Sequence, residues 1–283
     1  MKKIFLLLML MVSLCAIVLS AGCMDSSGHS GNLGNNLSDS PLFLSNTDPN
    51  NVPIKTAYNQ TVAEFFRFAI EGPYSTNPDW TSAALDPEPV ILYDINGKPQ
   101  YYEFYLRNGE TIPGYFWTSA NKIMGHAIFR IYEGAPFGNY SRLTRNAESL
   151  IKAQYPAYPI LLNTPALYSG GYPHLCAMVM IRNTTSGEYE RIIVDAFTHE
   201  IVPDHPSEDY RGHEYAWSYL DSIPQSEYST RIAQWELQDS NATRVVEYAM
   251  ANGIDIRLPL SEQNASIIRN YYASMSPGSS SPE

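Results

Sequence analysis

Residues 89–120, PVILYDINGKPQYYEFYLRNGETIPGYFWTSA, decide the fold of this chain. Two Asn-Gly pairs, at 96–97 and 108–109, divide the stretch into three runs of apolar or alternating residues. Asn-Gly between such runs indicates a β-hairpin, because both residues tolerate the positive φ angles of a type I′ turn. The stretch therefore predicts a three-stranded antiparallel meander, and a further short strand is expected at residues 127–132.

The middle run alternates between two faces. Tyr102, Phe104 and Leu106 point to one side of the predicted sheet, and the residues between them point to the other. Aromatic residues on this second side form a candidate binding face: Tyr101, Tyr105, Tyr115 and Trp117. Tyrosine suits recognition because it supplies a large contact area at low entropic cost. The alternative is that the C-terminal helices cover this side and make it a second core layer.

A helix precedes the meander, and the same order then repeats. Thr61-x-x-Glu64 is typical of a capping box, and apolar residues follow at helical spacing up to Gly72-Pro73. A second helical stripe comes next, followed by strand-like runs at 175–181, 189–195 and 200–202. The stripe consists of Leu143, Ala147, Leu150 and Ile151. Two helix-plus-meander units are therefore predicted, at residues 55–135 and 136–205.

Residues 206–275 are expected to be helical. One long apolar stripe ends at Asn252-Gly253, which is typical of a helix C-cap. An interruption of this helix is expected near residues 239–241. Ser261 begins a final helix. Residues 276–283 form a polar tail that is too poor in apolar residues to join a core. The predicted fold class is α+β: an antiparallel sheet from two units, with a helical C-terminal part packed on it.

The N-terminal segment is typical of an export signal. Met1-Lys2-Lys3 precedes residues 4–22, which carry no charge and end in Leu19-Ser20-Ala21-Gly22-Cys23. The small residues before Cys23 resemble the lipobox of prokaryotic lipoproteins, although Ser20 stands at −3, where leucine is usual. Three alternatives remain: cleavage after residue 22 with lipidation of Cys23, an uncleaved membrane anchor, or a plain cleaved signal. The Ser-, Gly- and Asn-rich residues 23–54 are expected to be a flexible linker.

Charge excludes nucleic-acid binding. Removing residues 1–22 removes Lys2 and Lys3 and no acidic residue, so 16 basic and 29 acidic residues remain, a formal charge of −13. Such a surface repels polyanions. After processing, Cys23 and Cys176 remain. An internal disulfide framework is therefore excluded, and Cys176 is expected to be a small core residue.

Six Asn-x-Ser/Thr sequons are candidates for glycosylation: Asn36, Asn59, Asn139, Asn183, Asn241 and Asn264.

The stretch GEYERIIVDAFTHEIV, residues 187–202, resembles the closing strands of PepSY-type modules, which read approximately y-x-v-x-v-D-x-x-T-G-x-v. The chain departs from that pattern at His199, where the family usually has glycine. The matching residues are Tyr189, Ile192, Val194, Asp195, Thr198, Ile201 and Val202, with the preceding helix at residues 141–155.

Residues 92–109, LYDINGKPQYYEFYLRNG, are similar to the helix-and-sheet prodomains and cystatin-like inhibitors of secreted cysteine peptidases. Both resemblances imply a non-catalytic module that binds or restrains a peptidase, or binds another extracellular ligand. They imply no cofactor.

A metal site is the alternative. Residues 199–214 contain His199, His205 and His213 among carboxylates, which would suit a divalent metal in a hydrolase. No His-Glu-x-x-His motif is present, and an acidic solvated loop is the competing interpretation. We therefore expect a non-enzymatic lipoprotein, anchored in the cell membrane by lipid, facing outside the cytoplasm, and binding a peptide or a secreted peptidase. A structural envelope component is a further possibility.

Overall fold

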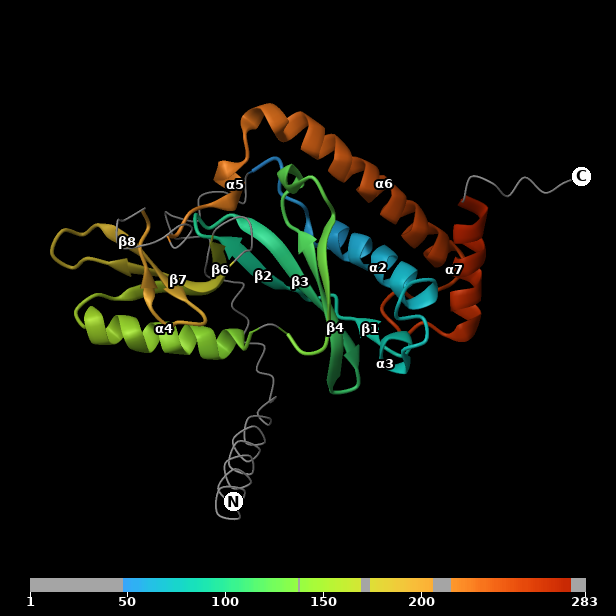
Figure 1. The fold of residues 1–283 in the computed structure, drawn as a ribbon, viewed down its shortest axis with the longest axis horizontal. Helices are drawn as coiled ribbons and strands as arrows, with labels where there is room; N and C mark the ends of the chain where they lie inside the picture. Colours follow the sequence, from blue (N-terminus) through green and yellow to red (C-terminus); the bar gives the residue numbers. More distant parts are fainter. Residues whose placement is uncertain (1–47, 137, 169–173, 206–214, 276–283) are drawn as a thin grey trace, which may run out of the picture. The chain divides into compact units, whose positions relative to one another are not determined.

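The computed structural model describes residues 48–136, 138–168, 174–205 and 215–275. Helices and strands of this part follow in chain order (Figure 1): α2 (Ile54–Ile70), α3 (Pro78–Thr81), β1 (Ala84–Leu85), β2 (Val90–Asp94), β3 (Pro99–Asn108), β4 (Thr111–Ser119), the 3₁₀ helix η2 (Lys122–Met124), β5 (Ile128–Glu133), α4 (Tyr140–Gln154), β6 (Ile160–Tyr168), β7 (His174–Arg182), β8 (Tyr189–Asp195), β9 (Ile201–Val202), α5 (Tyr219–Ser222), η3 (Gln225–Glu227), α6 (Tyr228–Ala251) and α7 (Glu262–Met275).

The strands form one largely antiparallel sheet. Its order in the described residues is β5-β4-β3-β2-β6-β7-β8-β9, and β1 pairs with β3 beside β2. Asn-Gly turns join β2 to β3 and β3 to β4, with positive φ at Gly97 and Gly109, so the predicted meander is confirmed. The predicted α+β class is confirmed with it.

The sheet has two halves of the same element order. A helix is followed by antiparallel strands from α2 to β5, here called the first half, and again from α4 to β9, the second half. The halves join where β2 runs parallel to β6, through Tyr93 beside Ala166 and Asp94 beside Leu167.

The two helices cover opposite faces of the sheet. Helix α2 packs on the side of β3 that carries Tyr102 and Phe104. Helix α4 packs with Ala147 and Ile151 on the other side, below β6 and β7 in Figure 1. Parallel central strands with helices on opposite faces are what a twofold rotation about an axis between β2 and β6, parallel to both, would produce. Such a rotation keeps the direction of the strands and exchanges the two faces of the sheet.

The start of α2 differs from the prediction. The helix begins at Ile54, after Pro53, and Thr61 lies in its second turn. Thr61 is buried, its hydroxyl donates to the Ala57 carbonyl at 2.8 Å, and it lies 2.6 Å from the Thr118 hydroxyl of β4. The capping-box prediction is therefore wrong, because a residue type that suits a cap also fits a buried helix position when it bonds to the preceding turn.

The C-terminal helices pack mainly on α2. Helix α6 lies along α2 in Figure 1, and α7 contacts both. Trp235, Val246 and Ile268 enter the same core as α2. Helix α6 runs unbroken through Asp239, where an interruption was expected. On this face the C-terminal part was expected to pack on the sheet, and α2 lies between them instead.

Strand β6 was not predicted. It contains Pro165, which cannot donate to a β ladder and argues against a strand interior. In the described residues β6 pairs with β2 only at Ala166 and Leu167, so Pro165 stands at the end of that parallel pairing, directly before its first residue. A proline is tolerated in such a place.

Candidate functional site at the open edge of strand β8

Strand β8 is longer than its outer neighbour. Strand β9 pairs with it at Ile193 and Val194, and Pro203 follows at once. In the described part of the chain no strand pairs with residues 189–192 on that side. In the first half, β5 pairs with β4 over five residue pairs, so the equivalent edge is closed there.

The backbone of this edge has a defined polarity. The Asp195 amide donates to the Glu200 carbonyl at 2.9 Å, on the β9 side, and the Ala196 amide donates to Leu175 on the β7 side. Successive residues of a strand direct their backbone groups to alternate sides. The N–H and C=O groups of Arg191 and Tyr189 therefore point to the open side, where a further strand would pair.

A cavity of about 490 Å³ lies along the same edge. It reaches both faces of the sheet around residues 189–193. Its lining comprises Ile95, Asn96, Gly97, Tyr155, Met178, Met180, Tyr189, Glu190, Arg191, Ile192, Ile193, Ile201, Val202, Pro203 and Asp204.

On the face away from α4 the cavity has an apolar floor and one fixed cation. Met178, Met180 and Ile193 belong to a buried cluster of the second half. The Arg191 guanidinium donates to the Ile95 carbonyl at 3.0 Å and to the Asn96 side-chain oxygen. These bonds hold the guanidinium against the β2–β3 turn of the first half.

Buried carboxylates hold the two turns beside the cavity. Asp195 accepts from the amides of Phe197 and Thr198, both at 2.8 Å, and from the Tyr168 hydroxyl. His199 follows with a φ of 58°, in the left-handed region that favours glycine.

Asp94 does the same in the first half. Its carboxylate accepts from the Asn96 amide at 2.7 Å and from the Ser218 hydroxyl at 2.6 Å. Burial raises the pKa of Asp94, while these hydrogen bonds act in the opposite direction. A buried carboxylate therefore anchors each turn: the β2–β3 turn, which lines the cavity, and the β8–β9 turn.

The predicted aromatic binding face lies elsewhere and is not open. Tyr101, Tyr115 and Trp117 are 1%, 2% and 2% exposed, and Tyr105 is 9% exposed. Residues of α4, of α5 and of the first turns of α6 cover them. These side chains form a second core layer, which was the alternative interpretation.

A buried carboxylate lies within this layer. Glu103 is fully buried and accepts hydrogen bonds from Tyr105 at 2.5 Å, from the Trp117 indole at 2.5 Å and from Tyr140 at 2.6 Å. Burial raises the pKa of Glu103, and the three hydrogen bonds offset part of that effect. Because Tyr140 is the first residue of α4, Glu103 links the two halves.

The histidine loop is described in part. His205 lies 2.8 Å from the Asp204 carboxylate and His199 lies in the β8–β9 turn, while His213 is outside the described residues. Within the described residues no three His, Cys, Asp or Glu side chains gather as a metal site. Cys176 is buried and donates to the Ala166 carbonyl, so its predicted core position is confirmed.

The predicted modification sites are spread over the chain. Cys23 and Asn36 lie outside the described residues. Asn59 is in α2, Asn241 in α6 and Asn264 in α7, while Asn139 caps α4 by accepting from the Arg142 amide. Asn183 is in the β7–β8 turn and accepts from two amides of that turn. In the part of the chain that the structure describes, no helix is long and apolar enough to span a membrane.

Sequence reasoning did not find Asn96, Glu190 and Arg191 as members of one cavity. Pro203 was the available signal, because a proline directly after an apolar pair shortens the strand that would cover β8. No protein-family model, curated protein or solved structure matches this chain.

Proposed function

We propose that this chain is an exported, non-enzymatic binding protein, tethered to the membrane outside the cytoplasm, that captures an extended peptide along β8. The peptide adds to the sheet as a strand beside residues 189–192. The observation that carries the proposal is the pair of outward-facing backbone groups at Tyr189 and Arg191, next to a cavity of about 490 Å³. Main-chain hydrogen bonds supply affinity in strand addition, and pockets for alternate side chains supply specificity.

The tether rests on the N-terminal sequence. The charge-free residues 4–22 and the small residues before Cys23 support export followed by lipidation. The Ser-, Gly- and Asn-rich sequence before residue 48 would separate the binding edge from the membrane, whereas Val52, near the end of the linker predicted at residues 23–54, is buried in the fold. A segment of a secreted peptidase is one peptide of this class, as the resemblance to peptidase prodomains implies.

Backbone-modified peptides test strand addition. An alternating valine–threonine octapeptide with a fluorescent label would be compared with two versions that are N-methylated at every second residue. The versions differ only in which edge of the peptide is blocked. A third version is methylated at every residue, so both of its edges are blocked. Because a peptide pairs with β8 through one edge only, we expect each half-blocked version to bind and the fully methylated version to lose binding. Fluorescence anisotropy measures the dissociation constants.

A variant of β8 provides the matched test on the protein side. Tyr189→Pro removes the outward N–H at the first residue of the strand, a position where proline is tolerated, and Tyr189→Ala removes only the side chain. We expect Tyr189→Pro to bind the peptide at least threefold more weakly than Tyr189→Ala, with equal thermal stability. Equal affinities, or binding of the fully methylated peptide, would contradict strand addition.

A further inference from the structure

We propose that the captured peptide carries a lysine or arginine whose side chain lies between Glu190 and Tyr155, on the α4 face of the open edge. This inference rests on the proposed function, since it assigns a residue type to a strand-added peptide.

The alternation of β8 places Glu190 on that face. Ile192 and Val194 belong to the core layer under α4, whereas Ile193 belongs to the buried cluster on the opposite face. Side chains of a strand alternate between faces, so Glu190 lies on the α4 face and Arg191 on the other. A peptide residue directly opposite Glu190 in the ladder points to the same face.

Glu190 is an exposed carboxylate, and in the described residues its side chain has neither a hydrogen bond nor an ion pair. Cations of α4, β7 and β8 are engaged with other groups. Lys152 of α4 pairs with Glu148, Arg182 lies over the Tyr189 ring, and Arg191 bonds to the β2–β3 turn on the opposite face. A peptide cation would therefore meet an unneutralised negative charge.

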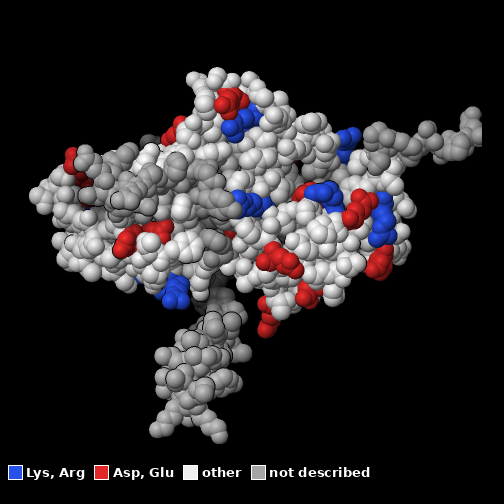
Figure 2. Space-filling model, in the orientation of Figure 1, with Lys and Arg blue, Asp and Glu red and all other residues white. Residues whose placement is uncertain are grey.

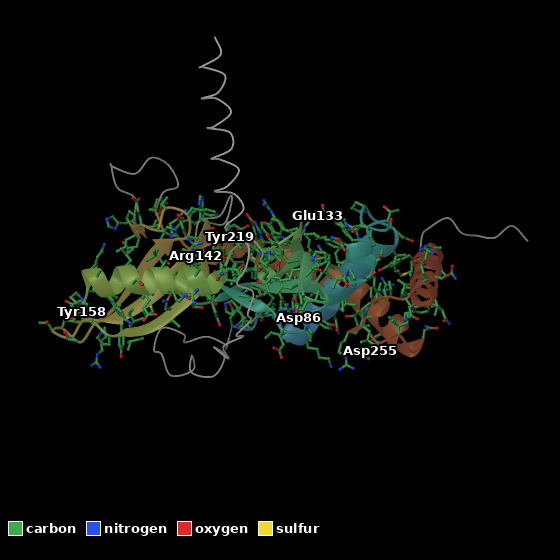
Figure 3. All side chains as sticks on the ribbon, turned by 90° about the horizontal axis from the view of Figure 1, so that it is seen from below. Asp86, Glu133, Arg142, Tyr158, Tyr219 and Asp255 are labelled. Carbon is green, nitrogen blue, oxygen red and sulfur yellow. The ribbon has the colours of Figure 1, made fainter. Side chains whose placement is uncertain are left out.

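Tyrosines and a helix end add to the attraction. Tyr155 lines the cavity and stacks on Tyr158, with ring centroids 5.9 Å apart and an interplanar angle of 24°. Both follow the C-terminus of α4; Figure 3 shows Tyr158 at the end of this helix opposite to Arg142. A helix C-terminus carries partial negative charge, and the face of a tyrosine ring attracts cations.

The net negative charge of the chain also favours the binding of a cationic peptide. Its formal net charge is −11, and the face in Figure 2 shows acidic and basic side chains interspersed over the described surface. A net negative protein attracts a cationic peptide at long range, and Glu190 then selects its register.

The test uses peptides whose register is fixed. In the valine–threonine octapeptide, N-methylation of every second residue leaves one edge able to pair with β8. The peptide adds antiparallel to β8, as β9 does, so the methylated residues, whose nitrogens point away from β8, direct their side chains to the α4 face. A single lysine is placed at a methylated or an unmethylated position, and norleucine replaces it in two control peptides.

We expect lysine at the methylated position to bind at least fivefold more tightly than norleucine there, and lysine at the unmethylated position to give no gain. Glu190→Gln should abolish the gain and leave the norleucine peptides unchanged. Glu200→Gln, which removes an exposed acidic residue from the β8–β9 turn, should keep it. Added salt should reduce the gain, since exposed charges are screened.

The outcomes separate the two proposals. A gain that survives in Glu190→Gln, or that is equal at both positions, overturns the assignment of the cation while peptide capture stands. Failure of all four peptides to bind overturns peptide capture itself, and the assignment of the cation falls with it.

Discussion

Glu103 shows how one residue ties distant parts of the chain together. Its carboxylate is fully buried, with donors from β3, β4 and the first residue of α4. Removing water from a carboxylate is unfavourable unless hydrogen bonds replace it. Three donors supply that replacement here, so the joint between the halves depends on a polar group inside an aromatic layer.

The pH dependence of stability tests this joint. Because burial raises the pKa of Glu103 above its unfolded value of about 4.3, folding favours the protonated form. The stabilisation by that form is fully present below the unfolded pKa and is lost as pH rises through the folded pKa.

Glu103→Gln removes this titration. We expect the variant to be less stable by about 1–3 kcal/mol at acidic pH, because donors reach both carboxyl oxygens of Glu103 and the NH2 group of glutamine cannot accept a hydrogen bond, whereas both oxygens of a protonated carboxyl can. The difference from the parent should shrink as pH rises from about 4 through the raised folded pKa. Urea denaturation across this range measures it, with the exposed Glu88→Gln as control. A difference that grows with pH would rule this account out.

Two residues mark the limit of local sequence signals. His199 adopts a φ of 58°, in the turn where the resembled family has glycine, and the turn forms nonetheless because Asp195 accepts two of its amides. Thr61 matched a capping box and proved to be a buried helix residue. Short motifs identify what a residue type can do, whereas burial decides which possibility is used.

At the scale of elements, α3 packs on the sheet through Trp80. Trp80 is completely buried, and its ring stacks on Tyr74 with centroids 3.9 Å apart. On its other side it meets Gly114 of β4, where a Cβ atom would lie 2.4 Å from the Trp80 ring and 2.6 Å from the Tyr132 carbonyl oxygen. Glycine is therefore required at position 114, because any side chain there would overlap the Trp80 ring and the Tyr132 carbonyl oxygen.

Gly114→Ala should therefore lower the free energy of unfolding by about 1–3 kcal/mol, the usual result of overpacking a closed core. Gly109→Asn is the matched control, because Gly109 has a φ of +61°, which asparagine tolerates, and open space around it. Thermal unfolding followed by circular dichroism measures both variants. An unchanged midpoint for Gly114→Ala would show that Trp80 moves aside.

The helices and strands that the sequence predicted are those specified by residues close together in the chain. Asn-Gly turns and alternation found β2, β3 and β4, and helical spacing found α4 and α6. Strand β6 escaped because Pro165 argues against a strand, and β1 because two residues are too few to alternate. The parallel contact of β2 with β6 has no local signal, since residues far apart in sequence make it.

At the scale of the molecule, the candidate site arises where the halves meet. Asn96 comes from the first half and Arg191 from the second, and their contact forms one wall of the cavity. Pro203 signalled a short β9, but the position of the β2–β3 turn beside β8 follows from the parallel junction. The open edge was thus within reach of sequence reasoning, whereas the cavity was not.

The proposed tether is also a property of the whole chain. If Cys23 is the lipidated residue, cells that produce the chain should incorporate a radioactive lipid precursor into it, and Cys23→Ser should incorporate less than a tenth as much. The buried Cys176 remains in both forms and serves as the internal control. Equal label in the two forms would exclude lipidation at Cys23.

The parallel junction of β2 and β6 has a consequence for how this architecture can change. Two residue pairs join halves that otherwise form their sheets from neighbouring segments of the chain. In the first half β5 covers the edge of β4 over five residue pairs, whereas in the described residues β9 covers only two residues of β8. Substitutions at the open edge are therefore remote from the core of the first half. One half can keep the fold while the other acquires residues for a new ligand.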